Sequence, residues 1–108
     1  MGITKTDQFT KHQNQIANQL KAMAHPARIA IIEYLLTVDT CICGDIVNEL
    51  PLAQPTVSQH LKELKNVGII KGSIEGKGIC YCVDEDAISE LLTYFQKINN
   101  KLNIKKCC

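Results

Sequence analysis

The chain has 108 residues, 45% of them hydrophobic and 21% charged, and a formal net charge of +1 at pH 7, so one globular domain over residues 1–108 is expected. No apolar run approaches the ~20 residues that cross a bilayer, and the polar first twenty residues lack the apolar segment of a secretory signal. These features exclude a membrane protein and predict a soluble protein of the cytoplasm.

Two helices separated by a proline are predicted in the first third of the chain. The side chains spaced for one face of the first helix are Phe9, Ile16, Leu20 and Met23. Pro26 cannot continue that helix, but its fixed φ angle suits the first turn of a second one. The predicted apolar stripe of the second helix consists of Ile29, Ile32, Leu35 and Leu36.

A short helix and a longer helix are predicted next. Asp45 can cap the short helix over residues 45–50, and Pro51 ends it. The longer helix has Pro55 in its first turn and Gly68 at its end, where these residue types are favoured. Its predicted buried arc is Val57, Leu61 and Leu64. The opposite arc is polar and basic.

The segment IIKGSIEGKGICYCV alternates in polarity and carries Gly76, Lys77 and Gly78 at its centre, which predicts a β-hairpin. Neighbouring side chains of a strand point to opposite faces, so Cys80 and Cys82 are expected to share one face.

A last helix is predicted after the hairpin, capped by Asp84 or Asp86. Its long apolar stripe consists of Ile88, Leu91, Leu92, Phe95, Ile98 and Leu102. This stripe exceeds what one small domain can cover, so a partner helix is expected to pack on it.

Two helices joined by a tight turn and followed by a basic, glycine-tipped hairpin predict a winged helix-turn-helix, a mainly α fold with a small β-hairpin. A lysine-rich helix face considered alone is usually only a solvated surface, but the order and spacing of these elements favour DNA binding. Gln59 can pair with adenine through two hydrogen bonds. The other predicted contacts to bases or phosphates come from Pro55, Thr56, Ser58, Lys62, Lys65 and Lys77.

Over roughly residues 20 to 84, three segments resemble the ArsR/SmtB family of metalloregulatory repressors. The second helix of the family resembles LKAMAHPARIAIIEYLL, its recognition helix resembles LPLAQPTVSQHLKELKNVGII, and its wing resembles EGKGICYCVDE. The resemblance implies a cytoplasmic homodimer, joined by its first and last helices, that holds a palindromic operator and releases it when an inducer binds. Arsenite, antimonite, zinc and cadmium are inducers in the family. No cofactor is required, and no catalytic group of residues can be assembled from these motifs. The positions that the resemblance places at DNA contacts are Gln54, Thr56, Ser58, Gln59 and His60.

Two positions near the recognition helix need separate treatment. His60 lies on the flank of the helix beside the buried arc, so contact with DNA and a packing or capping role both stay open. Ala53 stands where the family usually has a Ser or Thr that caps the helix. Another group must then accept hydrogen bonds from the first amides of the recognition helix.

The six cysteines are the candidate inducer ligands. In a reducing cytoplasm, metal binding, redox sensing or plain burial is more common than a structural disulfide. No C-x-x-C occurs, so neither a zinc ribbon nor a thioredoxin-like site is indicated. Residues 86–106 contain no His, which excludes the zinc site that one branch of the family carries on its last helix.

The segment CICGDIV is similar to the arsenic motif of the family but is displaced from it by one residue. Matching Asp45 to the acid that follows the motif puts Ile42 and Gly44 at the ligand positions. Cys41 and Cys43 then fall on the inward face of a short strand. Core packing, thiolate ligation and a redox pair all stay open for these two cysteines.

The strand that holds Cys41 and Cys43 normally pairs with the second wing strand, which holds Cys80 and Cys82. One residue of register decides whether the two pairs share a face. A shared face would allow a four-thiolate site or a cross-strand disulfide. Otherwise Cys80 and Cys82 are expected to be partly exposed wing positions.

The last two residues, Cys107 and Cys108, are vicinal thiols beside Lys105 and Lys106, whose charges favour thiolates. A tail without a function is the equally weighted alternative. As(III), Sb(III) or another thiophilic metal ion is therefore the expected inducer. A redox-sensing repressor, a family member without a metal response and a protein-interaction module remain alternatives. The predicted ligands are Cys41, Cys43, Cys107 and Cys108, with Cys80 and Cys82 ranked lower.

Overall fold

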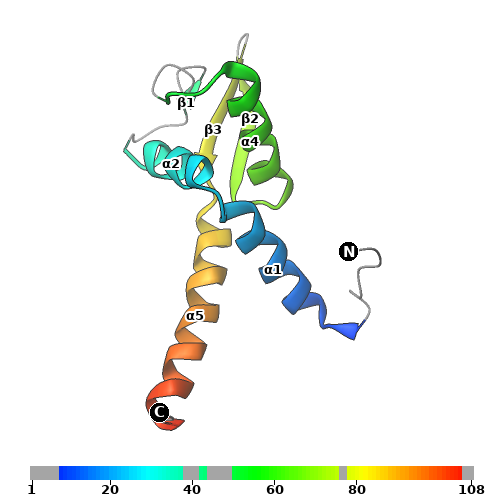
Figure 1. The fold of residues 1–108 in the computed structure, drawn as a ribbon, viewed down its shortest axis with the longest axis vertical. Helices are drawn as coiled ribbons and strands as arrows, with labels where there is room; N and C mark the ends of the chain where they lie inside the picture. The colour runs from blue at the N-terminus through cyan, green and yellow to red at the C-terminus, as the bar shows by residue number, and fades with distance from the viewer. Residues whose placement is uncertain (1–7, 38–41, 44–49, 76–77, 106–108) are drawn as a thin grey trace.

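The structure, a computed structural model, describes residues 8–37, 42–43, 50–75 and 78–105. Its elements in chain order are α1 (Lys11–Met23), α2 (Pro26–Leu35), β1 (Ile42–Cys43), α4 (Gln54–Asn66), β2 (Ile70–Glu75), β3 (Gly78–Val83) and α5 (Glu85–Lys105). Figure 1 shows α2, α4 and the strands gathered in one body, from which α1 and α5 diverge. The predicted winged helix-turn-helix order is confirmed. The short helix predicted over residues 45–50 lies outside the described residues except for Leu50.

Helix α1 begins at a capping box, which corrects the expected position of Phe9. The Thr10 hydroxyl accepts a hydrogen bond from the Gln13 amide at 3.0 Å, and the Gln13 side chain accepts one from the Thr10 amide at 3.0 Å. The chain becomes helical only after Thr10, so Phe9 lies before the helix with 58% of its surface exposed. Ile16 is buried as predicted.

Helix α2 begins at Pro26, as predicted, but the stripe that it buries differs from the expected one. The residues that it buries are Ile31, Ile32 and Leu35. Ile29 and Leu36 are 39% and 66% exposed because both lie on the flank of this arc, where packing against α4 and the sheet ends. Hydrophobicity alone did not distinguish the flank of the stripe from its centre.

The three strands form one sheet in the order β1-β3-β2. Strands β2 and β3 pair antiparallel from Ile70 opposite Val83 to Glu75 opposite Gly78, which confirms the predicted hairpin. Strand β1 pairs antiparallel with the other edge of β3, also as predicted. The second wing strand is therefore the central strand of the sheet.

The core orients α4. Val57 and Leu64 are fully buried and Leu61 is 6% exposed, which confirms the predicted arc. They pack in one cluster with residues of α1, α2, β2 and α5. Gly68, with φ of +80°, turns the chain from this helix towards β2, a conformation that glycine adopts without strain. The opposite face of α4 is consequently left to solvent.

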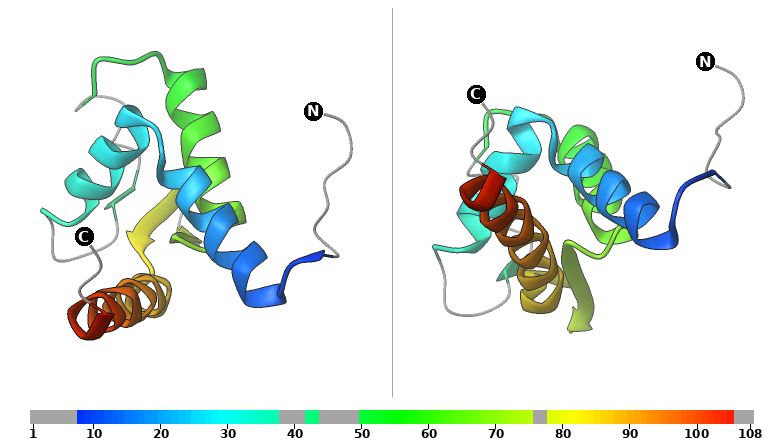
Figure 2. Two further views of the ribbon diagram at one scale, coloured as in Figure 1. Left: turned by 60° about the horizontal axis from the view of Figure 1, so that its bottom comes forward. Right: turned by 90° about the horizontal axis from the view of Figure 1, so that it is seen from below.

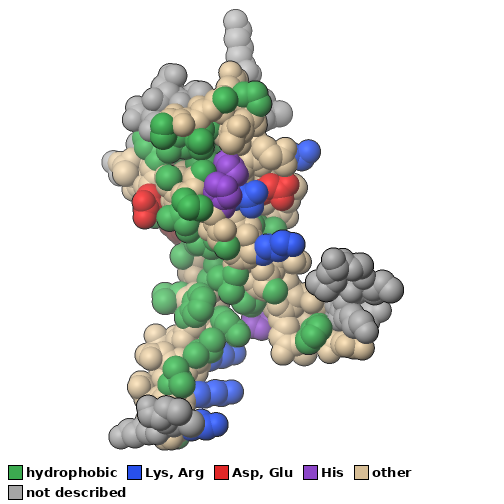
Figure 3. All heavy atoms as spheres, in the orientation of Figure 1, with side chains coloured by type: hydrophobic (Ala, Val, Ile, Leu, Met, Phe, Trp, Pro, Cys, Tyr) green, Lys and Arg blue, Asp and Glu red, His purple; other side chains and the backbone are tan. Residues whose placement is uncertain are grey.

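Helix α5 is anchored to the rest of the protein by its N-terminal half. Asp84 Oδ1 accepts hydrogen bonds from the amides of Asp86 and Ala87, so Asp84 is the capping residue. Of the predicted stripe, Leu91 is buried and Ile88 is half-buried against the core, whereas Leu92, Phe95, Ile98 and Leu102 are exposed; Ala87 is also buried. Seen from below in Figure 2, α1 and α5 stand in front of the sheet and α4. In Figure 3, hydrophobic side chains run along α5 while cationic side chains gather on its other edge.

None of the described helices combines the length and apolarity needed to cross a membrane.

Candidate nucleic-acid interface

The outward face of α4 is a continuous polar and basic surface. Figure 1 shows α4 beside the hairpin, at the end of the molecule opposite to the end that α5 reaches. The predicted contact residue Lys77 lies outside the described residues. The predicted residues that the structure brings together on the exposed face of α4 are Gln54, Pro55, Thr56, Ser58, Gln59, Lys62 and Lys65. This surface has the composition and shape of a helix that enters a DNA groove.

Glu63 orients the side chain of Gln59. The Gln59 Nε2 group donates a hydrogen bond to Glu63 Oε1 at 3.0 Å, one helical turn further on. A Gln side-chain amide has two N–H donors and one carbonyl acceptor, so this bond leaves one donor and the acceptor available. These are the two groups that pair with the N7 and N6 atoms of adenine.

The first turn of α4 lacks a side-chain cap. Ala53 is in the extended N-cap conformation, and no side chain of the described residues accepts from the first amides of this helix. Val57 N donates to the Ala53 carbonyl at 3.1 Å, which is the first backbone bond of the helix. The partial positive charge of the helix start therefore stays available to an anionic group such as a phosphate.

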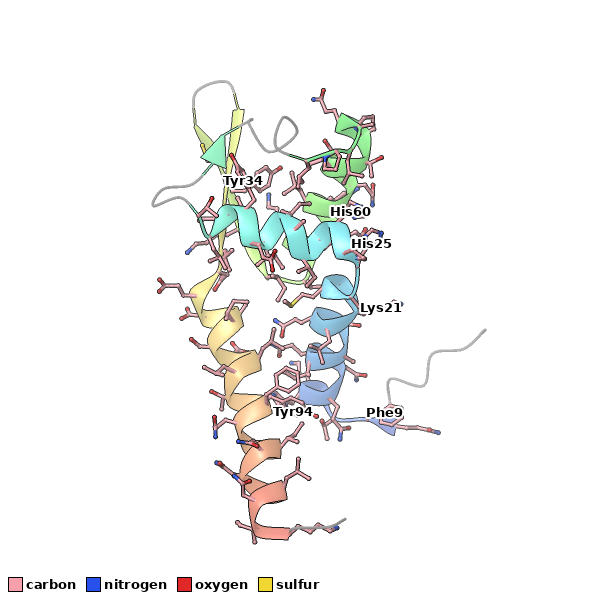
Figure 4. All side chains as sticks on the ribbon, turned by 60° about the vertical axis from the view of Figure 1, so that its left-hand side comes forward. Phe9, Lys21, His25, Tyr34, His60 and Tyr94 are labelled. Carbon is pink, nitrogen blue, oxygen red and sulfur yellow. The ribbon has the colours of Figure 1, made fainter. Side chains whose placement is uncertain are left out.

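His60 is buried in a polar junction between α1, α2 and α4. Arg28 Nε donates to His60 Nδ1 at 2.9 Å, and Arg28 Nη1 donates to the carbonyl of Ala22 at 3.0 Å. Figure 4 shows His25 and His60 side by side at this junction, with ring centroids 4.6 Å apart. His60 is only 8% exposed. Its surroundings therefore favour the packing role over the contact with DNA.

Burial lowers the pKa of His60 below its ordinary value, and the nearby His25 and Arg28 lower this pKa further. Because Nδ1 accepts from a guanidinium, which has no acceptor of its own, the hydrogen-bond pattern requires a neutral ring with its proton on Nε2. Protonation of Nδ1 would remove the acceptor and set two cations against each other.

Two residues of this interface were not foreseen from the sequence. Glu63 lies four positions after Gln59, so the pair could have been found from its helical spacing. Arg28 could not, because its partner His60 is 32 positions away and only the fold brings them together.

The sheet brings two cysteines together. In the β1–β3 register the backbone of Cys43 pairs directly with that of Cys80, and directly opposed positions of an antiparallel pair belong to the same face of a sheet. Cys80 is disulfide-bonded and only 1% exposed. The expectation of a partly exposed wing position was therefore wrong for Cys80, because its side chain points into the body of the protein. Cys82 is half-buried.

The remaining predicted ligands Cys41, Cys107 and Cys108 lie outside the described residues. Within the part of the chain that the structure describes, no three His, Cys, Asp or Glu side chains are close enough together to hold a metal ion.

Comparison with known proteins gives concordant matches. Residues 25–71 match the model of the family described as bacterial regulatory protein, arsR family. The chain is 32% identical over 90 residues to the cadmium resistance transcriptional regulatory protein CadC homolog of Staphylococcus aureus, covering 82% of this chain and 73% of that protein.

Two solved structures share the fold. An ArsR-like transcriptional regulator from Rhodococcus sp. RHA1 superposes with a TM-score of 0.77 at 17% identity, covering 89% of this chain and 90% of that one. The homodimeric winged helix-turn-helix DNA-binding domain Mb0332 of Mycobacterium bovis, described as a possible ArsR-family transcriptional regulator, superposes with a TM-score of 0.66 at 20% identity, covering 98% and 94%.

The lowered pKa of His60 predicts a loss of stability in mild acid. A histidine whose pKa is below 6.5 in the folded protein takes up a proton first in the unfolded state, so the free energy of unfolding falls as the pH drops through 6.5. His60→Gln keeps an acceptor for Arg28 but does not titrate. We expect the wild type to lose more unfolding free energy than His60→Gln between about pH 7.5 and about pH 5.5, measured by urea denaturation.

Titration of the His60 ring protons by NMR provides the direct check. A pKa at or above 6.5 for His60 in the folded protein, or an equal pH dependence in the two proteins, would contradict the proposed junction.

Proposed function

The chain belongs to the ArsR family of bacterial regulatory proteins, and we propose that it is a transcriptional repressor that holds palindromic double-stranded DNA as a homodimer in the cytoplasm. The observation that carries the proposal is the exposed polar face of α4 beside the hairpin. The relatives and the neighbouring folds are transcriptional regulators and not enzymes.

Helix α4 supplies the readout of the DNA sequence in this proposal. Its outward face lies in the major groove, where Gln59, oriented by Glu63, pairs with an adenine. Lys62 and Lys65 neutralise phosphates, and the uncapped start of the helix meets another phosphate. Lys77, which the sequence places between β2 and β3, is assigned in this proposal to the DNA backbone or the minor groove. His60 is left out of the contact set because it is buried against Arg28.

The second protomer covers the exposed stripe of α5. Leu92 is 65% exposed, Leu102 55% and Phe95 48%, on a helix whose other edge carries lysines. Burying an apolar side chain of this size is favourable by roughly 1.5–3 kcal/mol relative to leaving it in water. The Mb0332 domain, which shares the fold, is homodimeric. Packing of α1 and α5 against the same helices of a second copy would present two α4 helices to a two-fold operator.

A thiophilic ion is the proposed inducer. The S. aureus relative is named as a cadmium resistance regulator, and soft ions such as As(III) and Sb(III) select thiolates over other ligands. The candidate ligands remain Cys41, Cys43, Cys107 and Cys108, with Cys80 and Cys82 ranked lower. An ion bound by a thiolate of β1 would act on β3, because β3 pairs with β1 on one edge and with the other wing strand, β2, on the other. Release follows if the ion binds the DNA-free arrangement more tightly than the DNA-bound one.

Substitutions on α4 test the contact with DNA. With an operator that the protein itself selects from random duplexes, Gln59→Ala is expected to weaken binding by about 1–3 kcal/mol and to relax the preference at one base pair. Lys62→Ala is expected to reduce the slope of log K against log salt by about one. Fluorescence anisotropy over a salt series measures both effects. Lys101→Ala, which removes an exposed lysine of α5, the helix that extends away from α4, is the matched control and should bind like the wild type.

Full affinity and an unchanged salt slope in the Gln59→Ala, Lys62→Ala double variant would overturn the assignment of α4 as the recognition helix.

Substitutions on α5 test the dimer. Ile98→Asp would bury an unpaired carboxylate in the proposed interface, so it should convert the protein to a monomer with weakened operator binding. Asn100→Asp adds the same charge outside the apolar stripe of this helix and should remain a dimer. Light scattering after size-exclusion chromatography distinguishes the two. A dimeric Ile98→Asp variant would place the interface elsewhere.

Arsenite tests the inducer. Added to the fully reduced protein bound to its operator, arsenite is expected to release the DNA, whereas magnesium, which prefers oxygen ligands, should not. Comparing Cys43→Ser with the Cys107→Ser, Cys108→Ser double variant locates the ligands, because only the thiols that bind arsenite should be needed for release. Retention of the operator at saturating arsenite would reject this inducer and leave the DNA-binding proposal intact.

A further inference from the structure

The two opposed cysteines of the sheet are the feature that the proposed function does not explain. We propose that Cys43 and Cys80 form a thiol–disulfide site, which low-molecular-weight disulfides such as oxidised glutathione close into a covalent link between β1 and β3. This site goes beyond DNA binding and inducer release, and it does not depend on either.

The strand register identifies Cys43 as the partner of Cys80. Cys80 is disulfide-bonded, and Cys43 is the residue directly opposite it on the neighbouring strand. Opposed residues of an antiparallel pair have Cα atoms about 4.5–5.5 Å apart, well within the range that a disulfide spans. Cys82 lies two positions along the same strand, at about 6.6 Å, which is near the upper limit of that range.

The burial of Cys80 sets the order of the reaction. Cys80 is only 1% exposed in the disulfide-bonded form that the structure contains, so we assign its sulfur the second step and not the first encounter with a disulfide from solvent. The Cys43 thiolate therefore attacks the disulfide RSSR, which releases one thiol RSH and leaves a Cys43–SR mixed disulfide. The Cys80 thiolate then displaces the second RSH. The two protein thiols are oxidised, RSSR is reduced, and two RSH leave.

The link acts on the DNA-reading part of the chain. The segment between Cys43 and Cys80 contains α4 and β2, whereas α1, α2 and α5 lie outside it. Strand β3 pairs with β1 on one edge and with β2 on the other. Closure therefore ties the strand that precedes the recognition helix to the centre of the wing and restricts the unfolded chain.

The test uses the full chain with Cys41, Cys82, Cys107 and Cys108 replaced by serine. After reduction and treatment with oxidised glutathione, mass spectrometry is expected to find a protein lighter by two hydrogens, with Cys43 and Cys80 in one linked peptide. The matched control keeps Cys43 and Cys82 and carries Cys80→Ser. In this control the reaction should stop at a mixed disulfide with glutathione, without a link between Cys43 and Cys82. Equal closure of both pairs, or no closure of the first, would overturn the proposal.

Two single substitutions in the same background test the order of attack. Cys80→Ala should accumulate one glutathionyl group on Cys43, and Cys43→Ala should leave Cys80 unmodified while the protein is folded, as checked by circular dichroism. Modification of Cys80 in the folded Cys43→Ala protein would contradict the order.

A second measurement keeps the proposal testable if Cys80 variants fail to fold. In the wild-type chain, oxidation should raise the melting temperature by at least about 5 °C. Cys43→Ser should abolish the increase, and Cys41→Ser should retain it. A rise that survives Cys43→Ser would assign the disulfide to another pair. No DNA is present in these measurements, so their outcome is separate from that of the operator experiments.

Discussion

One guanidinium, held between a carbonyl group and a neutral imidazole, joins α1, α2 and α4, the proposed recognition helix, beside the apolar core. Arg28 of α2 donates to the Ala22 carbonyl at the end of α1 and to His60 of α4. A guanidinium carries donors only and keeps its charge, so each buried N–H needs an acceptor. The carbonyl is always an acceptor, but His60 is one only while Nδ1 is unprotonated. In the proposed dimer, this side chain joins an interface helix to the helix that reads DNA.

Local sequence signals were sufficient for the elements that carry the proposed DNA-contacting face. The buried arc of α4 follows from helical spacing, and both Val57 and Leu64 are fully buried. The end of this helix at Gly68 and the start of α2 at Pro26 follow from backbone restrictions that act within a few residues. The prediction of one exposed polar face on α4 was confirmed for the same reason: the opposite arc is fixed once the buried arc is known.

Features that depend on distant residues could not be predicted. The Arg28–His60 bond spans 32 positions, and Ile29 is exposed because the edge of the packing surface decides which apolar residues of α2 are covered. Phe9 is a different case, because the missed signal was local: the capping box of Thr10 and Gln13 begins the helix after Phe9 and outweighs hydrophobic periodicity there. The register of β1 on β3 is the clearest case: the sequence allowed either alignment, and a shift of one residue would separate Cys43 from Cys80.

This arrangement indicates where a chemical signal can act on DNA binding. Helix α4 is held by side chains without exposed surface, and a core packed to that density resists gradual displacement. Strand β1, by contrast, consists of two residues at the edge of the sheet, where it pairs with β3. A bond formed between β1 and β3 would therefore act on the strand that carries the wing and would reach α4 only through that strand. Because the wing and α4 must fit one duplex together, a change in their relative position is sufficient to change operator affinity.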